Sequence, residues 1–405
     1  MNFISPFKKI ICHYCFEKFH LSEAPRRSIN FSSTFNDKKL GKFLDRPGIE
    51  TGPVTNPSEF PLWQKVFSKI MIFNDFKSFR KICPNCHMNL STLTSKGKFN
   101  TNMIAIIGKR GSGKSNYLGV LLNQLCEQYA GEVGFRVVPQ ESYSVTQDMM
   151  VSSSDLYNEN YYKYIYENNV AVEASESSRR NIQQRIPLVY RLEFNNKSID
   201  LVFFDAAGED LEDSDTLNQF YKYIHHAIGV IFLIDPLDFP LLKQKINYVP
   251  SIWENPTSSL EEEESDKLHN VIENIANSFY NRGIVSVNKK IKTHFAFAIS
   301  KLDLFRERIN PQITLGRPIF HEGGFNQKKV ETQSEDVIGL LHELGGEKVL
   351  NLIKRNYHSS NFFAFSALGN SPIGENRKIK SPSPINVADP LLWLLYKTGF
   401  IPKLI

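Results

Sequence analysis

The sequence predicts an α/β fold in which helices cover both faces of a mostly parallel sheet. Short apolar runs recur along the chain, and each has the length and composition of a strand buried inside a sheet: 103–107, 227–234, 293–299 and 361–365. Segments with helical spacing of apolar residues separate several of these runs. Buried strands that alternate with helices are typical of a three-layer arrangement around a parallel sheet.

A glycine-rich loop follows the first of these strands. It reads Gly108-Lys109-Arg110-Gly111-Ser112-Gly113-Lys114-Ser115, with Asn116 directly after it. The glycines let backbone N–H groups surround phosphate oxygens, and Lys114 brings a positive charge to the β- and γ-phosphates. Ser115 offers a hydroxyl to Mg²⁺, and the helix that begins here points its positive end at the same place. We therefore expect a P-loop that binds a nucleoside triphosphate.

The surroundings of this loop favour the P-loop interpretation over a chance glycine-rich turn. A strand precedes the loop, and apolar residues at the spacing of one helix face follow it. These residues are Leu118, Leu121, Leu122, Leu125 and Tyr129.

Length and composition set broad limits. With 405 residues, the chain is long enough for two domains or for one large domain with insertions. Charged residues make up 22% of the chain, and the net charge of +5 is too small to indicate a nucleic acid or membrane partner. No apolar run approaches the roughly 20 residues of a membrane helix, and the N-terminus leaves no room for a signal peptide before its first cysteine. We expect a cytoplasmic protein.

Four of the five cysteines form two CxxC pairs, Cys12 with Cys15 and Cys83 with Cys86. They are typical of the two knuckles of a zinc ribbon, in which four thiolates hold a structural Zn²⁺, although four unrelated cysteines are the alternative. The gap 16–82 is longer than usual, so we interpret it as an insertion with loop composition at first and a helix at 62–79. Because four thiolates complete the shell, His13 and His87 are expected to be bystanders.

The sequence also allows expectations for the fifth cysteine and for the segments before and after the P-loop helix. Cys126 lies beside the apolar helix face, so we expect a buried free thiol. Residues 91–101 have the composition of a linker. Residues 134–186 are polar and lack sustained periodicity, apart from a helix expected at 155–168, and we expect a mobile, nucleotide-sensing loop there.

Two strands and a turn are predicted next. Residues 187–194 alternate, with Arg191 and Glu193 on a face that we expect to be wet. The turn 195–197 and a second strand at 198–204 complete an antiparallel hairpin beside the parallel sheet.

The second strand of this hairpin ends in Asp205-Ala206-Ala207-Gly208. A carboxylate at the end of a strand next to the P-loop strand suits Mg²⁺, and the N–H of Gly208 suits the γ-phosphate. The alternative is a strand-terminating Asp-Gly turn.

The last third of the chain supplies a base-recognition motif. After an insertion at 237–290, whose acidic run 261–264 we interpret as the first turn of a helix, the strand 293–299 leads into Ser300-Lys301-Leu302-Asp303. The carboxylate of Asp303 can accept two N–H groups of guanine, and the stem of Lys301 can cover the base. Small residues Ser366 and Ala367 after the last strand would let a backbone N–H approach guanine O6. A closing amphipathic helix is expected after Asp389-Pro390.

With these motifs in this order, the sequence resembles the GTPases of the TRAFAC class, which have a Ras-like fold with one antiparallel edge strand. The resemblance covers residues 99–405 and implies a GTPase domain with an insertion at about 237–290, preceded by a zinc-ribbon-like module at 1–98. More narrowly, the CxxC pairs together with IGKRGSGKS, FFDAAGEDL, FLIDPL and DPLLWLL resemble the zinc-ribbon-bearing "double-GTPase" proteins of bacterial conflict systems.

The resemblance implies a role for each motif. The P-loop residues bind the phosphates, Lys114 and Ser115 also act in catalysis, and Ser115 and Asp205 hold Mg²⁺. Asp205 and Gly208 sense the γ-phosphate, whereas Ser300, Lys301, Asp303, Ser366 and Ala367 form the base pocket.

Two departures from the family pattern concern catalysis. Glu209 stands where Ras-like enzymes carry a water-orienting Gln, so we expect slow or partner-dependent hydrolysis. Arg110 stands where they usually have a small Gly, and it either supplies a catalytic charge, blocks an external arginine or points to solvent. We find no clear switch threonine, and the nearest hydroxyls are Ser175, Ser177 and Ser178.

The function we expect is a Mg²⁺-dependent GTPase switch that acts on partner proteins, including a second GTPase, with the zinc module as a docking platform. Three alternatives stay open. A P-loop ATPase or nucleotide kinase would leave 300–303 without a role, and Glu209 motivates a GTP-gated scaffold with negligible hydrolysis. A zinc-ribbon nucleic-acid binder would depend on basic residues that are scattered, namely Arg26, Arg27, Lys38 and Lys39.

Overall fold

The computed structural model describes most of the chain. The described residues are 9–30, 32–59, 78–95, 102–109, 111–144, 149–173, 186–203, 214–245, 262–305, 315, 319, 321 and 323–404. Within them, the largest sheet has seven strands in the order β16-β15-β14-β8-β13-β12-β9. These strands are β8 (Met103–Gly108), β9 (Arg136–Pro139), β12 (Leu188–Phe194), β13 (Lys197–Phe203), β14 (Ala227–Ile234), β15 (His294–Ile299) and β16 (Ser360–Ala364).

The directions of these strands confirm the predicted α/β class with a mostly parallel sheet. The strands β8, β13, β14, β15 and β16 run parallel to their neighbours in this group. Strand β12 is antiparallel to both β13 and β9. The expectation of an antiparallel edge strand is therefore wrong in one detail, because β9 pairs with the outer side of β12 and becomes the edge.

The predicted hairpin forms between β12 and β13. Its expected wet face is wrong for Arg191, whereas the Glu193 side chain is 41% exposed. Asn195 and Asn196 make the turn with φ angles of 46° and 63°, a left-handed conformation that asparagine tolerates. Arg191 is only 4% exposed and lies opposite Asp200, which is 1% exposed. The Arg191 Nε donates to Asp200 Oδ1 at 2.8 Å and its Nη2 donates to Oδ2 at 3.1 Å. A buried ion pair thus takes the place of solvated charges.

Asp200 has a second side-chain neighbour besides Arg191. The Nε2 atom of His13 lies 3.4 Å from its Oδ2. Burial alone would raise the pKa of the Asp200 carboxyl, but the hydrogen bonds from His13 and Arg191 hold that pKa below its usual range.

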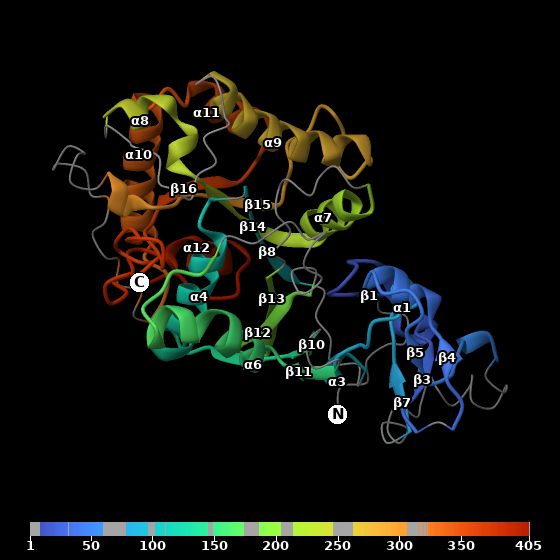
Figure 1. The fold of residues 1–405 in the computed structure, drawn as a ribbon. Coiled ribbons are helices and arrows are strands. Elements are labelled where there is room, and N and C mark those ends of the chain that lie inside the picture. Colours follow the sequence, from blue (N-terminus) through green and yellow to red (C-terminus); the bar gives the residue numbers. More distant parts are fainter. Residues whose placement is uncertain are drawn as a thin grey trace.

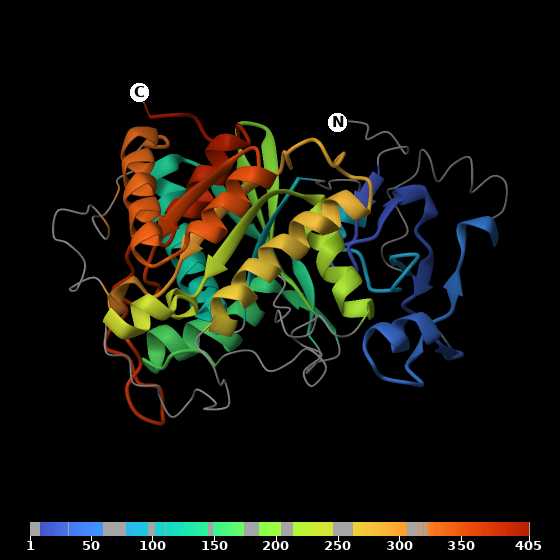
Figure 2. The ribbon, with the colours of Figure 1, turned by 90° about the horizontal axis from the view of Figure 1, so that it is seen from above.

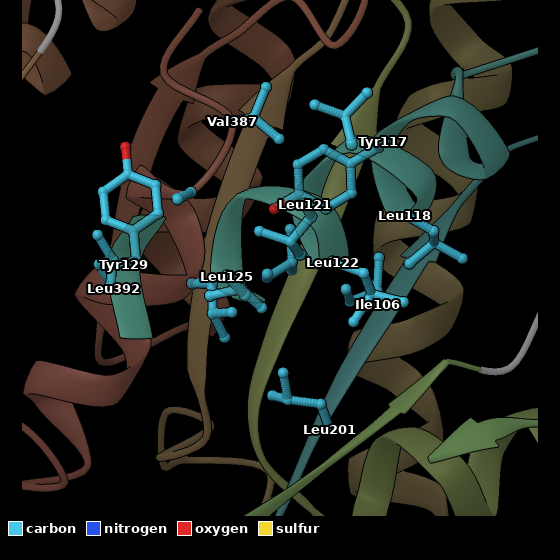
Figure 3. Packing of buried hydrophobic residues seen from close by; sticks show 14 of the residues in the cluster. Ile106, Tyr117, Leu118, Leu121, Leu122, Leu125, Tyr129, Leu201, Val387 and Leu392 are labelled. Carbon is cyan, nitrogen blue, oxygen red and sulfur yellow. The ribbon is translucent and has the colours of Figure 1, made fainter. Parts of the chain in front are cut away.

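Helices cover both faces of the sheet (Figure 1). The helix α4 (Lys114–Gln124) continues through a π-helical turn at Leu125–Tyr129 into α5 (Ala130–Val133). The predicted apolar face of this helix is buried. Figure 3 shows Leu121, Leu122 and Leu125 among the side chains packed between Ile106 of the sheet and Leu392 of α12 (Asp389–Lys397). The helix α12 is buried throughout 389–395 rather than on one face, because it lies against β14 and β15.

The opposite face carries several helices, which Figure 2 shows extending between the N-terminal module and the β16 edge. They are α7 (Ser214–His226), α8 (Pro240–Lys245), α9 (Glu262–Asn281), α10 (Gln327–Glu343) and α11 (Glu347–Asn356). The helix α9 begins within the acidic run, as predicted. Among the described residues, no helix has both the length and the apolar character needed to cross a membrane.

The segment expected to be a long irregular loop is largely ordered. Besides β9, it contains β10 (Glu141–Ser144), β11 (Met149–Ser152) and α6 (Ser153–Tyr157), followed by a π-helix at Asn158–Glu167. The loop expectation is wrong for these residues because their apolar side chains, such as Leu156 and Ile165, pack against the α4 side of the sheet. The expected helix at 155–168 is confirmed. Residues 174–185, with the candidate switch hydroxyls, lie outside the described residues.

The N-terminal module consists of short elements. They are β1 (Lys9–Ile11), β2 (Lys18–His20), β3 (Arg26–Ser28), β4 (Phe35–Asn36), α1 (Lys38–Phe43), β5 (Glu50–Thr51), β6 (Val54–Thr55), β7 (Phe79–Lys81) and α3 (Thr92–Ser95). The helix expected at 62–79 falls mostly outside the described residues, and its last residue, Phe79, begins β7 instead. The linker expected at 91–101 contains α3.

We expect replacement of Asp200 by asparagine to lower the free energy of unfolding by about 3 to 5 kcal/mol, because it leaves the buried Arg191 guanidinium beside a neutral group. Chemical denaturation measures this loss. Glu193→Gln on the same hairpin is the control, since the Glu193 pair with Arg136 is exposed and 3.7 Å long and contributes about 1 kcal/mol or less. Similar losses in the two variants would contradict a special cost for the buried pair.

Candidate functional site

The glycine-rich loop has the backbone shape of a phosphate cradle. Gly111 and Gly113 have φ angles of 82° and 79°, in the left-handed region that favours glycine. A Cβ on Gly108 would lie 2.5 Å from Ser112 Oγ and 3.0 Å from Leu233 Cβ. The three glycines are therefore required by the turn itself.

The polar groups of the loop suit an anionic ligand. The helix α4 begins at Lys114, so its free N–H groups face the loop. Lys114 and Ser115 are each 7% exposed, and Ser112 is fully buried. Within the described residues, Ser112 Oγ has no hydrogen-bond partner. A buried hydroxyl without a partner inside a ring of glycines is the arrangement that a phosphate group would complete.

Two residues of the candidate set direct their side chains to other parts of the chain. Lys109 Nζ lies 2.7 Å from Asp238 Oδ1. The side-chain amide of Asn116 bonds the backbone of Val172 in both directions, accepting from its N–H at 2.9 Å and donating to its C=O at 3.3 Å. Asn116 thus fastens the chain just before 174–185 to the P-loop helix.

An acidic turn that the sequence analysis did not single out connects the P-loop to the base motif. Asp235 follows β14 and caps a short 3₁₀ turn, accepting from the Leu237 N–H at 3.0 Å. Its Oδ2 lies 2.7 Å from Lys301 Nζ and 3.6 Å from the place where a Cβ of Gly111 would stand. An aspartate directly after a buried strand was the available signal, but its partner could not be identified without the fold.

The base motif is held in a defined geometry. Lys301 has a φ angle of 54°, which turns the chain sharply after β15. The two oxygens of Asp303 accept from Ser366 Oγ at 2.5 Å and from Ser371 Oγ at 3.2 Å. Ser300 is buried and its hydroxyl donates to the Ile234 carbonyl at 3.2 Å. Ser371 was not predicted, because nothing in its local sequence indicates this contact.

Two backbone N–H groups after β16, those of Ser366 and Ala367, are candidates for the contact to guanine O6. The N–H of Ser366 already donates to the Ile385 carbonyl at 3.1 Å, and Ser366 Oγ accepts from the Gly369 N–H at 2.9 Å. Ala367 is buried beside them. The Ala367 N–H is therefore a better candidate than the Ser366 N–H for a contact to guanine O6.

Several predicted site residues lie outside the described residues: Arg110, Asp205, Gly208 and Glu209. The strand β13 ends at Phe203, two positions before Asp205 in the sequence, and it pairs in parallel with the P-loop strand β8. The assignment of these residues stays a prediction.

The four cysteines of the CxxC pairs form one buried cluster. Their Sγ atoms all lie within 4.8 Å of one another, with Cys12 and Cys86 3.8 Å apart and Cys15 and Cys83 3.7 Å apart. A tetrahedral Zn²⁺ with bonds of about 2.3 Å would separate its sulfur ligands by about 3.8 Å. The two sulfur pairs at 3.7 and 3.8 Å therefore match the spacing that a tetrahedral zinc ion requires.

The electrostatics of this cluster favour a bound cation. Burial raises the pKa of the Cys12 and Cys86 thiols, whereas hydrogen bonds from the other sulfurs lower the pKa of Cys15. A metal ion would offset the cost of burying several thiolates. His87 is a bystander, with its Nδ1 2.8 Å from Asp37 Oδ1. The expectation that Cys126 is buried is wrong, since Cys126 is exposed. It lies in the π-helical turn Leu125–Tyr129, whose buried residues are Leu125 and Tyr129.

Comparison with known proteins gives matches at low similarity. The family profile described as "Poxvirus A32 protein" matches residues 93–247, less than half of the 405-residue chain. A relative from Mycolicibacterium smegmatis, "Putative ESX-1 scaffolding and assembly protein SaeC", is 24% identical over 348 residues, which are 79% of this chain and 80% of the relative.

Similar solved structures are named as GTP-binding or GTPase-like proteins. The Saccharomyces cerevisiae Ski7 GTPase-like domain, bound to GDP and inorganic phosphate, matches 75% of this chain with 15% identity and a TM-score of 0.34. This chain spans 51% of that Ski7 chain. A putative nucleolar GTP-binding protein 1 from Plasmodium falciparum matches 74% of this chain and 90% of its own, with 11% identity and a TM-score of 0.27. Similarity at this level identifies neither an activity nor a substrate.

We expect purified protein to carry about one Zn²⁺ per chain, because four thiolates complete a tetrahedral shell. Metal analysis after gel filtration measures this content. Cys83→Ser should abolish it, whereas Cys126→Ser removes an exposed thiol outside the cluster and should leave it unchanged. Wild-type protein purified without chelator and found to be free of zinc would rule the site out.

Proposed function

We propose that the chain is a Mg²⁺-dependent GTP-binding protein that hydrolyses GTP and switches partner proteins between two states. The observation that carries the proposal is the junction at Asp235, where the P-loop and the Lys301 side chain meet at the carboxyl ends of neighbouring strands. Ligands of open α/β sheets bind at this edge. One molecule with phosphates at one end and a base at the other would contact both motifs.

Each part of this site has a distinct task in the proposal. The backbone of 108–115 and Lys114 would hold the phosphates. Ser115 with Asp205 would hold Mg²⁺, which would supply charge stabilisation of the transferred phosphoryl group. Gly208 would contact the γ-phosphate. Glu209 would stand near the attacking water, where a carboxylate is repelled by phosphate, so the proposal includes slow hydrolysis that a partner accelerates.

The Asp303 carboxylate is the reason to prefer GTP over ATP. Guanine presents N1–H and a 2-amino group, both donors, to a carboxylate at this position. Adenine presents an acceptor nitrogen there, which would leave the carboxylate facing another lone pair. The hydroxyls of Ser366 and Ser371 orient the carboxylate before a base arrives.

A second candidate is a GTP-gated scaffold with negligible hydrolysis. It is favoured by the Mycolicibacterium relative, whose name describes scaffolding and assembly. Both candidates require partner proteins, and by the resemblance these are products of a bacterial conflict system, including a second GTPase. A nucleic-acid partner has less support, because Arg27 donates to Asp37 and Asn89 and Lys39 donates to the Pro84 carbonyl.

The decisive experiment compares GTP with ATP in a binding titration, followed by a turnover assay. We expect Asp303→Asn to weaken GTP binding by about 10-fold or more and to improve binding of xanthosine triphosphate, because the amide can donate to the carbonyl that replaces the amino group. Glu335→Gln on the exposed side of α10 is the control. Equal wild-type affinity for ATP and GTP would contradict the proposal.

A second prediction concerns Arg110. If this side chain supplies charge to the transition state in cis, Arg110→Ala should lower turnover by about tenfold or more with little change in GTP affinity, because the charge develops mainly during the reaction. Lys245→Ala, which removes an exposed partner of Glu343, is the control. An unchanged basal rate with a higher partner-stimulated rate would instead identify Arg110 as a steric gate.

A further inference from the structure

A short segment outside the predicted motifs connects the P-loop helix to the loop that carries the base residues. We call residues 169–172 the strap and residues 366–380, which follow β16, the base loop. Asn116 lies in the first turn of α4 and holds one end of the strap. Its side-chain amide accepts from the Val172 N–H at 2.9 Å and donates to the Val172 carbonyl at 3.3 Å.

The strap pairs with the base loop through their backbones. The Ala171 N–H donates to the Arg377 carbonyl at 3.0 Å. In the other direction, the Ile379 N–H donates to the Asn169 carbonyl at 2.9 Å, and one antiparallel β-bridge lies between these two bonds. Ala171 and Ile379 are buried in the same hydrophobic cluster. The strap and this part of the base loop therefore form one paired unit.

The base loop carries the connection onward to the Asp303 carboxylate. The Lys380 N–H donates to Asn370 Oδ1 at 3.1 Å, and Asn370 Nδ2 donates to the Leu368 carbonyl at 3.1 Å. Asn370 thus joins the two sides of the base loop. The next residue, Ser371, donates from its Oγ to Asp303 Oδ2 at 3.2 Å. A continuous path of hydrogen bonds and backbone therefore runs from the P-loop helix to the carboxylate that would read the base.

Ser371 needs support from outside its own loop. It lies seven positions after Ala364, the last residue of β16. Holding a loop of this length in one shape costs conformational entropy, and bonds to a well-packed element offset that cost. The helix α4 is such an element, because its apolar face is buried in the core. Through the strap, the helix that begins at the P-loop helps to set the position of Ser371.

We propose that Asn116 is a positioning residue for guanine recognition, and that it acts on the Asp303 carboxylate through the strap and Ser371. Its side chain is then not a ligand of the phosphates. This inference rests on the proposed function, which assigns guanine recognition to Asp303. Loss of the Asn116 amide releases the base loop and weakens binding of the base, whereas the phosphate cradle of 108–115 keeps its own backbone geometry.

The test measures binding of GTP and of inorganic tripolyphosphate, each with Mg²⁺, to the full chain by titration calorimetry. Tripolyphosphate supplies the phosphates without a base. Asn116→Ala removes two hydrogen bonds, so it should weaken GTP binding by about 5-fold or more and change tripolyphosphate affinity by less than about 2-fold. Gln128→Ala is the matched control, because it removes an exposed side-chain amide that bonds Glu132 further along the same helical rod. It should change neither affinity.

A double-mutant cycle separates positioning from direct contact with the nucleotide. In a Ser371→Ala background the base loop has no hydroxyl to present to Asp303. Adding Asn116→Ala to that background should therefore reduce GTP affinity by less than about 2-fold further. Asn370→Ala cuts the path at its other end and should reproduce the GTP-selective loss. It carries the test if Asn116→Ala does not fold.

The outcomes separate this inference from the function on which it rests. Equal losses of GTP and tripolyphosphate affinity in Asn116→Ala would identify Asn116 as a phosphate ligand and overturn the inference alone. Losses that add fully in the cycle, or an unchanged GTP affinity in both Asn116→Ala and Asn370→Ala, would also overturn it. Wild-type protein that does not distinguish GTP from ATP would overturn the proposed function, and the inference with it.

Discussion

The candidate site depends on the ion pair between the Asp235 carboxylate and Lys301. The carboxylate lies at the end of β14, between the strand of the P-loop and the strand of the base motif, and it pairs with Lys301 beside Gly111. Three residues further on, Asp238 pairs with Lys109 of the loop. Two carboxylates from one short turn therefore hold the side chains of a P-loop lysine and a base-motif lysine. The same turn thus contacts both motifs of the candidate site.

Much of the fold could be predicted because the signals are local. The apolar strands, the P-loop helix and the hairpin follow from patterns within short stretches of sequence. The spacing within each CxxC pair indicated that the four thiols would form one cluster. The features that could not be predicted depend on partners far away in the sequence. Alternation predicted that Arg191 is exposed, because periodicity reflects only the polarity of each residue. It cannot show that the Asp200 carboxylate neutralises the Arg191 guanidinium inside the protein. The edge strand β9 was missed because only four residues, with one proline, form it.

The site shows the same division between local and distant signals. The motif residues could be proposed because each motif is a short sequence pattern. Ser371 was not, since a serine in a loop that contains Pro and Gly has no distinguishing pattern until the fold brings it to Asp303. The packing of the N-terminal module was also not predicted. Ile11 and Phe16 lie in the same hydrophobic cluster as Phe232 and Phe297 of the sheet, so this part of the module shares the core of the larger domain.

The contact between the first CxxC knuckle, Cys12–Cys15, and α7 affects how the chain folds during its synthesis. The Gln219 side chain of α7 donates to the Tyr14 carbonyl, and these two residues are 205 positions apart. At the usual rates of translation, α7 is completed roughly 10 to 40 s after the knuckle leaves the ribosome. During that interval Phe16 lacks its ring contact with Tyr223 of α7, and the knuckle is accessible to metal ions and to chaperones. Cys83 and Cys86 also precede α7 in the sequence, so all four cysteines of the cluster are synthesised before this docking contact can form. If the cluster binds Zn²⁺ as we expect, the ion can be acquired before the knuckle docks on α7.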